Sequence, residues 1–210
     1  MRISRWVCSS LLAVVLCALY GCAAVGVTSS EDPSKKLTDA GHMLDQGRAL
    51  PAERLIHEAI AIYRERDEPH GLGYAYGLYA ELLQSNAVNK AELSYMRHGF
   101  RDASITFTNR FEKSAEYIRM AIVQYEQAID QHRRSDKYDA LTNAHLHLAW
   151  LHQRLSEKAA ACKNFQKTLE AYAMNQLRNP QAKPHQPRSG QSIADYVGDQ
   201  MRKAQCAEAL

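Results

Sequence analysis

An internal repeat of small residues is the feature that most constrains how this chain can fold. Alanines recur in two sets, each set in segments with helical spacing: Ala40, Ala80 and Ala149, then Ala52, Ala121 and Ala161. The offsets within the first set are 40 and 69 residues, and within the second set they are 69 and 40. A single period of 40 explains both sets if the middle copy carries an insertion at about residues 85–111. The sequence therefore predicts three copies of a helix pair.

Each copy has the spacing that two antiparallel helices need. Small residues let the helix axes approach closely, and a larger residue four positions after the second alanine fills the gap: Ile56, Tyr125 and Phe165. Ala, Leu, Glu, Gln and Arg abound, and strand-type alternation is scarce after residue 35. We therefore expect an all-α fold.

The repeat resembles the tetratricopeptide repeat (TPR) family across residues 34–174. The matching positions are Ala40/Gly47/Ala52/Ile56/Ala59, Ala80/Ala121/Tyr125/Ala128 and Leu148/Ala149/Ala161/Phe165. The period is longer than is usual for the family, and Thr168 stands where Ala is usual. The resemblance implies a short right-handed solenoid of three hairpins with a concave groove. An unrelated array of helical hairpins with the same packing is the alternative.

Local signals mark the ends of the TPR-like domain, which we place at residues 34–177. Asp32 followed by Pro33 predicts a helix start. Residues 178–191 form a Pro-rich polar linker that cannot continue a helix. Ser192 then opens an amphipathic segment, residues 192–210, which we expect to form a helix that caps the array.

The first 22 residues resemble a bacterial lipoprotein leader. Arg2 and Arg5 precede a short apolar run, which ends in Leu19-Tyr20-Gly21-Cys22. The resemblance implies that residues 1–21 are removed and that Cys22 carries the lipid, palmitate included. Residues 22–33 would then be a flexible tether. Ala23 is not the Asp that retains such proteins at the inner membrane, so the resemblance implies the outer membrane, facing the periplasm. An ordinary signal peptide or an uncleaved anchor is the alternative.

Cys162 and Cys206 are the cysteines that remain beyond the leader and the lipid site. A pair in an oxidising compartment is a candidate disulfide. In an ideal helix Cys206 lies off the apolar stripe of its segment, so the bond would need the end of that helix to fray. The net charge of +3 includes Arg2 and Arg5, so the mature chain is nearly neutral and offers no general reason to bind nucleic acid.

The resemblance also implies a partner-binding groove. Its family positions fall on Tyr74, Glu81, Asn143, Trp150 and Arg154. Trp150 and Arg154 lie one helical turn apart, and an aromatic ring with a guanidinium suits a peptide segment that carries a carboxylate. Alternatively, Trp150 is a packing residue beneath the capping helix.

The insertion is a second candidate surface, because aromatic and basic residues alternate in it. Tyr95, Arg97, Phe100 and Arg101 have the composition of interface anchors. Long insertions into short turns are often functional. The alternative is that the insertion forms a small hydrophobic core of its own, with a short helix at 88–98 that folds back onto the array.

We find no catalytic motif in the sequence and expect neither an enzyme nor a cofactor. His145, His147 and His152 lack the spacing of a metal site. The sequence thus predicts a membrane-anchored scaffold that holds a protein partner in the bacterial envelope. An immunity or inhibitor lipoprotein that blocks a toxin or lytic enzyme is the main alternative, and a small-molecule carrier is a third.

Overall fold

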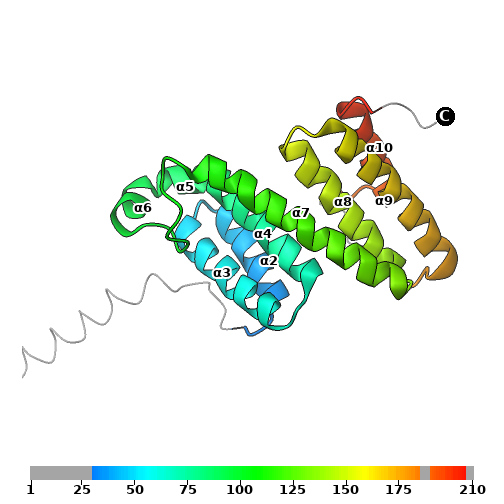
Figure 1. Ribbon diagram of the computed structural model, residues 1–210, viewed down its shortest axis with the longest axis horizontal. Helices are drawn as coiled ribbons and strands as arrows, with labels where there is room; N and C mark the ends of the chain where they lie inside the picture. Colours follow the sequence, from blue (N-terminus) through cyan, green and yellow to red (C-terminus); the bar gives the residue numbers. More distant parts are fainter. Residues whose placement is uncertain (1–29, 185–189, 207–210) are drawn as a thin grey trace, which may run out of the picture. The chain divides into compact units, whose positions relative to one another are not determined.

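A computed structural model describes residues 30–184 and 190–206, and within these ranges every regular element is a helix. This confirms the predicted all-α class. The helices, which Figure 1 shows in order, are α2 (Pro33–Asp45), α3 (Ala49–Glu65), α4 (Pro69–Gln84), α5 (Asn86–Lys90), α6 (Glu92–His98), α7 (Arg110–Arg134), α8 (Tyr138–Arg154), α9 (Lys158–Arg178) and α10 (Ile193–Lys203).

The long helices pack against their neighbours in chain order. The pairs in closest contact are α2 with α3, α4 with α7, and α8 with α9. Successive pairs are joined through α3 with α4 and through α7 with α8, while α10 packs on α9. The first helices of the pairs also touch, since α4 contacts both α2 and α8. This order places α4 at the centre of the folded unit.

The repeated alanines and the larger residues between them form the core. Ala40, Ala80 and Ala149 are completely buried, and so are Ala52, Ala121 and Ala161. Ile56, Tyr125 and Phe165 fill equivalent interior positions and are at most 1% exposed. Thr168 is buried at its unusual position because its hydroxyl donates to the Asn164 carbonyl, at 2.8 Å.

Both predicted helix starts are confirmed. The Asp32 carboxylate accepts from the Ser34 amide at 2.9 Å, directly before Pro33. The Ser192 hydroxyl accepts from the Asp195 amide at 3.1 Å and opens α10. Each cap satisfies an amide that has no partner within its own helix.

Five helices end in the same kind of turn. In each, a residue with φ between 50° and 74° follows the helix, and the next amide donates back to the last helical turn: Gly47, Asp67, Asp136, Ser156 and Gln205. Asp67 and Asp136 occupy equivalent positions at the 69-residue offset of the repeat. The connections between helices therefore repeat as well as the helices themselves.

The last of these turns brings Cys206 to Cys162. Because Gln205 has φ +51°, the chain leaves the axis of α10 there, and the Cys206 amide donates to the Met201 carbonyl at 2.9 Å. The two cysteines form a disulfide, with their Cα atoms 5.6 Å apart. The expectation that the helix continues to residue 210 needs correction, since α10 ends at Lys203. Residues 207–210 lie outside the described ranges.

In the described part of the chain, no helix is both long enough and apolar enough to cross a bilayer. The predicted leader, Cys22 and most of the tether lie outside the described residues. The same holds for residues 185–189 of the Pro-rich linker.

Candidate functional site

The predicted groove residues lie on two helices that touch, α4 and α8. Arg154 reaches across from the end of α8 and donates to the Gly77 carbonyl of α4, with a nitrogen–oxygen distance of 3.3 Å. A side chain at residue 77 would meet Leu151 only at 3.6 Å, so there is space at this point of α4. The structure thus brings α4 and Arg154 together across 77 residues of sequence.

An open hollow of about 300 Å³ lies beside this contact. Its walls are formed by Glu81, Gln84, Ser85 and Arg154. Partial burial lowers the pKa of the Arg154 guanidinium, and the negative charge of Glu81 opposes this effect. The hollow therefore offers a donor and an acceptor of opposite charge to a ligand.

Aromatic rings continue along the same helices toward α10. The Tyr74 and His147 ring centroids are 5.4 Å apart, and His147 and Trp150 are 5.1 Å apart. His147 also stacks on Tyr125 at 5.2 Å, which fixes its ring against the core. Tyr74 is exposed, while Asn143 is half-buried on α8. These rings form a continuous row whose outer members are accessible.

Trp150 connects the row to the capping helix. It is half-buried, packs against the cluster that includes Ile193 and Val197, and meets Tyr196 with a centroid distance of 6.0 Å. Its position therefore fits the alternative of a packing residue beneath α10 at least as well as that of a ligand-binding residue. Arg154 and Glu81 remain the accessible polar pair.

The insertion folds as two short helices, α5 and α6, and a loop. Tyr95 is 2% exposed and Phe100 is 6% exposed, and their rings stack with centroids 4.1 Å apart. This corrects their assignment as exposed anchors, because both side chains fill a small core between the insertion and the helices beneath it. Arg97 and Arg101 do lie on the surface, as expected.

A buried carboxylate holds this small core in place. Glu53 of α3 accepts from the Tyr79 hydroxyl at 2.9 Å and from the Arg101 amide at 2.8 Å. Burial raises the pKa of Glu53, and its hydrogen bonds partly offset that rise. Glu53 therefore links α3, α4 and the loop after α6.

Arg110 is a second connection. Its guanidinium donates to the Leu83 carbonyl at 2.8 Å and to the Asn89 side chain. It also lies over the Phe107 and Phe111 rings, 4.6 and 4.3 Å from their centroids. Leu83 belongs to the last turn of α4, where carbonyls lack helical partners. Arg110 thereby caps α4 and fixes α5 to α7.

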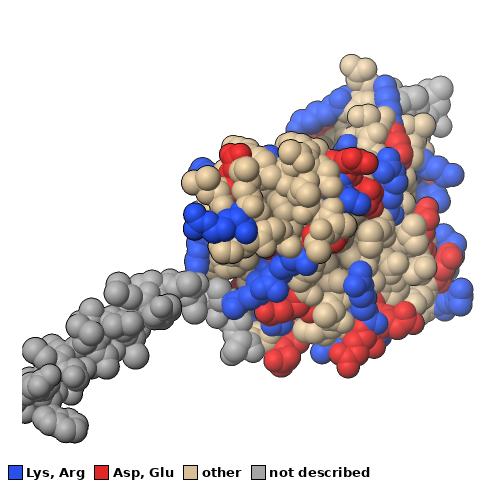
Figure 2. Space-filling model, turned by 60° about the vertical axis from the view of Figure 1, so that its left-hand side comes forward, with Lys and Arg blue, Asp and Glu red and all other residues tan. Residues whose placement is uncertain are grey.

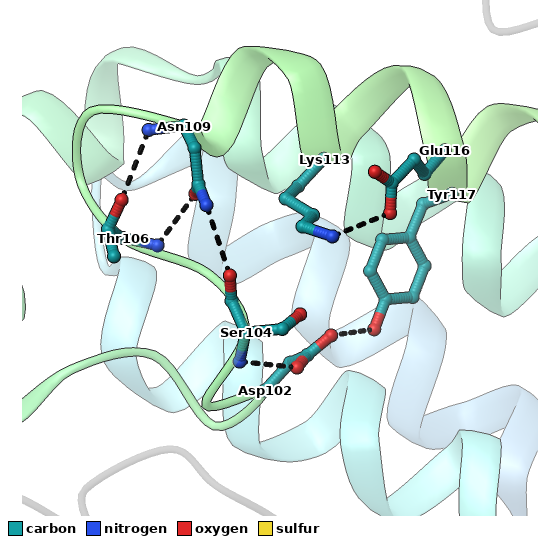
Figure 3. A network of polar contacts seen from close by, with 7 residues as sticks. All are labelled: Asp102, Ser104, Thr106, Asn109, Lys113, Glu116 and Tyr117. Carbon is teal, nitrogen blue, oxygen red and sulfur yellow. Dashed lines mark hydrogen bonds and ion pairs between the residues drawn. The ribbon is translucent and has the colours of Figure 1, made fainter.

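The loop before α7 is ordered by its own polar side chains (Figure 3). The Asp102 carboxylate accepts from the Ser104 amide at 2.9 Å and from the Tyr117 hydroxyl at 2.7 Å. Burial tends to raise the pKa of Asp102, but these hydrogen bonds outweigh it, and the pKa is lowered. The Thr106 amide donates to the Asn109 side chain at 2.7 Å. The insertion is thus a rigid extension of the array.

Sequence reasoning missed a pair of histidines between α4 and α7. His70 Nδ1 lies 3.0 Å from His132 Nε2, and Tyr125 meets the His70 ring edge-on at 5.4 Å. Burial, together with His132, lowers the pKa of His70 to about 4. Burial also lowers the pKa of His132. The two residues lie at no equivalent repeat position, so the sequence carried no signal that they meet.

The histidines of α8 are occupied by other contacts. His145 bonds the Asn164 side chain at 3.0 Å and His152 bonds Glu157 at 2.6 Å. Among the described residues, no three His, Cys, Asp or Glu side chains are grouped so that they could hold a metal ion.

Comparison with known proteins adds no family. No protein-family model, curated protein or solved structure matches this chain.

Proposed function

We propose that this protein is a TPR-like interaction scaffold that is anchored to the bacterial envelope by a lipid on Cys22. The order of helix contacts supports the TPR-like part. Three hairpins follow one another, their first helices touch through α4, and α10 covers the last hairpin. The recurrence of both the alanine positions and the turn geometry supports the same arrangement. A right-handed array of this kind presents its first helices on one concave face.

The observation that carries the proposal is the hollow between α4 and α8, which is lined by an acidic and a basic side chain. Glu81 and Arg154 come from different hairpins and meet only in the folded chain. An acceptor and a guanidinium side by side can bind both the amide and the carbonyl groups of an extended peptide, or its acidic side chain. The exposed ring of Tyr74 extends this surface along α4. We therefore propose that a protein segment binds along α4 and α8.

The anchor is supported by the sequence of the leader. A Cys directly after the apolar run, behind Leu-x-Gly, is the pattern of lipid modification. One acyl chain gives only marginal membrane binding, whereas several anchor a protein stably. Mass spectrometry of the membrane fraction tests this part: we expect an N-terminal peptide that begins with an acylated Cys22. Unmodified residues 1–21 in the mature protein would contradict it.

Capture of a partner from envelope extract tests the scaffold. Residues 31–210, which form a compact unit, serve as bait beside a variant with Glu81→Ser and Arg154→Ser. A charge-matched control carries Arg119→Ser and Glu126→Ser, both exposed on α7. We expect a partner that the control retains and the hollow variant loses.

Equal capture by all three baits, or capture by none, would contradict binding at the hollow. A lytic enzyme or toxin that loses its activity when captured would replace the scaffold with the inhibitor alternative. Deleting residues 86–110 is a poorer test, because the deletion also removes Arg110, Tyr95 and Phe100, which pack the ends of α3 and α4.

A further inference from the structure

The end of the folded unit that carries the insertion exposes several large apolar side chains. In the described ranges eight large apolar residues are exposed, and four lie at this end: Leu50 in the first turn of α3, Leu93 and Met96 on α6, and Phe111 in the first turn of α7. Leu93 is 81% exposed and Met96 is 67% exposed. Figure 2 brings this end forward and shows a broad area of uncharged residues, with Lys and Arg and some Asp or Glu at its edge.

Basic residues accompany these apolar side chains. Between residues 86 and 101 the chain contains Lys90, Arg97 and Arg101, against the single acid Glu92. Arg97 follows Leu93 by four positions on α6, so the two side chains share one face of that helix. The surface thus combines protruding apolar tips with long basic side chains.

Contacts with α3, α4 and α7 hold this surface in place. Arg110 fixes α5 to α4 and α7, and Glu53 holds the chain at Arg101 directly after α6. The stacked rings of Tyr95 and Phe100 fill the space beneath α6. Leu93 and Met96 therefore have no interior position to occupy without dismantling this core.

We propose that Leu93 and Met96, with Lys90, Arg97 and Arg101 around them, dock this end of the protein onto an anionic phospholipid bilayer. Lys and Arg bury their aliphatic stems against apolar material and keep their charge among headgroups, which matches this mixture. Each basic side chain near the surface is attracted to anionic lipid. The anchors of a protein interface gather in a packed pocket, whereas here the apolar tips protrude.

The proposal rests on the proposed lipid anchor because that anchor would keep the protein close to a bilayer. Lys90 lies against Gly47 in the turn after α2, so the docking surface is at the end of α2 remote from Pro33. Helix α2 is about 20 Å long. An extended tether over residues 23–32 reaches about 35 Å. The tether is therefore long enough for the anchor and this surface to meet the same membrane, where weak docking is strengthened by proximity.

Vesicle sedimentation tests the docking without the lipid. Residues 31–210 are mixed with phosphatidylcholine vesicles that either contain or lack phosphatidylglycerol. We expect binding to the anionic vesicles that weakens with added salt, and a loss of about tenfold or more in the variant with Leu93→Ser and Met96→Ser. Leu177→Ser, at an equally exposed apolar residue on α9, is the matched control and should bind as the parent does.

Failure of the parent to bind anionic vesicles, or equal binding by the α6 variant, overturns the proposal. If vesicles are not bound and the α6 variant loses a captured envelope protein, this surface is a protein interface instead. Neither result changes the capture experiment with Glu81 and Arg154, so the docking surface and the proposed function fail independently. Thermal unfolding of each variant first establishes that it is folded.

Discussion

Breaking the disulfide should destabilise the protein by an amount that its loop length determines. Cys162 and Cys206 are separated by 44 residues. In the chain-entropy treatment, a closed loop of that size stabilises the folded state by about 4 kcal/mol, because it restricts the unfolded chain. For a domain of this size, such a loss corresponds to a fall in Tm of about 8–16 °C. Helix α10 should remain attached, since Ile193 and Val197 are completely buried independently of the bond.

Thermal and urea unfolding of residues 31–210, with and without dithiothreitol, measure this effect. A variant with both Cys162→Ser and Cys206→Ser serves as the control, because reductant should change the parent and leave this variant unaltered. The reduced parent and the variant should also unfold at similar temperatures. A Tm that moves by less than about 1 °C on reduction would refute the reasoning, because the bond would then not constrain the unfolded chain.

Three further predictions concern α4 and its neighbours. The pKa of His70 is lowered to about 4 in the folded state, so the unfolded chain takes up the proton first as the pH falls. The free energy of unfolding should therefore decrease by up to about 3 kcal/mol as the pH drops from about 6.5 toward 4. His70→Gln should flatten this part of the urea-midpoint profile, and parallel profiles would exclude His70 as its source. Gly71→Ala should lower the free energy of unfolding by about 1–3 kcal/mol, because the added Cβ would lie 2.1 Å from the Tyr63 ring. Gly77→Ala on the same helix should be neutral or stabilise by up to about 1 kcal/mol, and equal urea midpoints for the two alanine variants would disprove the packing argument. Arg110→Ala should lower the free energy of unfolding by about 3 kcal/mol, because it leaves the Leu83 carbonyl buried without its donor. It should also speed proteolysis within residues 86–109. Unchanged cleavage there would show that other contacts hold the insertion.

The core was predictable because its determinants are local and repeated. The spacing of Ala40, Ala80 and Ala149 fixes where helices approach, and the same spacing is visible in the sequence without knowledge of the fold. Helix starts at Asp32 and Ser192 follow from capping chemistry that involves only neighbouring residues. The cysteine pair was predictable from the number of cysteines left beyond the predicted leader. The turn at Gln205 that brings the sulfurs together was not predictable, since it requires a non-glycine residue at positive φ.

The candidate surfaces were less predictable because burial depends on distant partners. Tyr95 and Phe100 have the composition of surface anchors, yet Glu53 and the ends of α3 and α4 give them an interior to fill. Trp150 was a candidate groove residue, but it packs against the cluster that includes Ile193 and Val197 of α10. His70 and His132 meet across 62 residues of sequence at unrelated repeat positions. A pattern along one helix cannot tell which neighbouring helix will cover it.

Site-specific photo-crosslinking in the native cells tests the central claim most directly. A photoreactive amino acid at residue 81, on the hollow, is compared with one at residue 126, on the exposed face of α7. We predict a discrete crosslinked envelope protein from residue 81 that is absent from residue 126 and diminished by Arg154→Ser. The same products from both positions, or none from residue 81, would contradict a scaffold that holds its partner between α4 and α8.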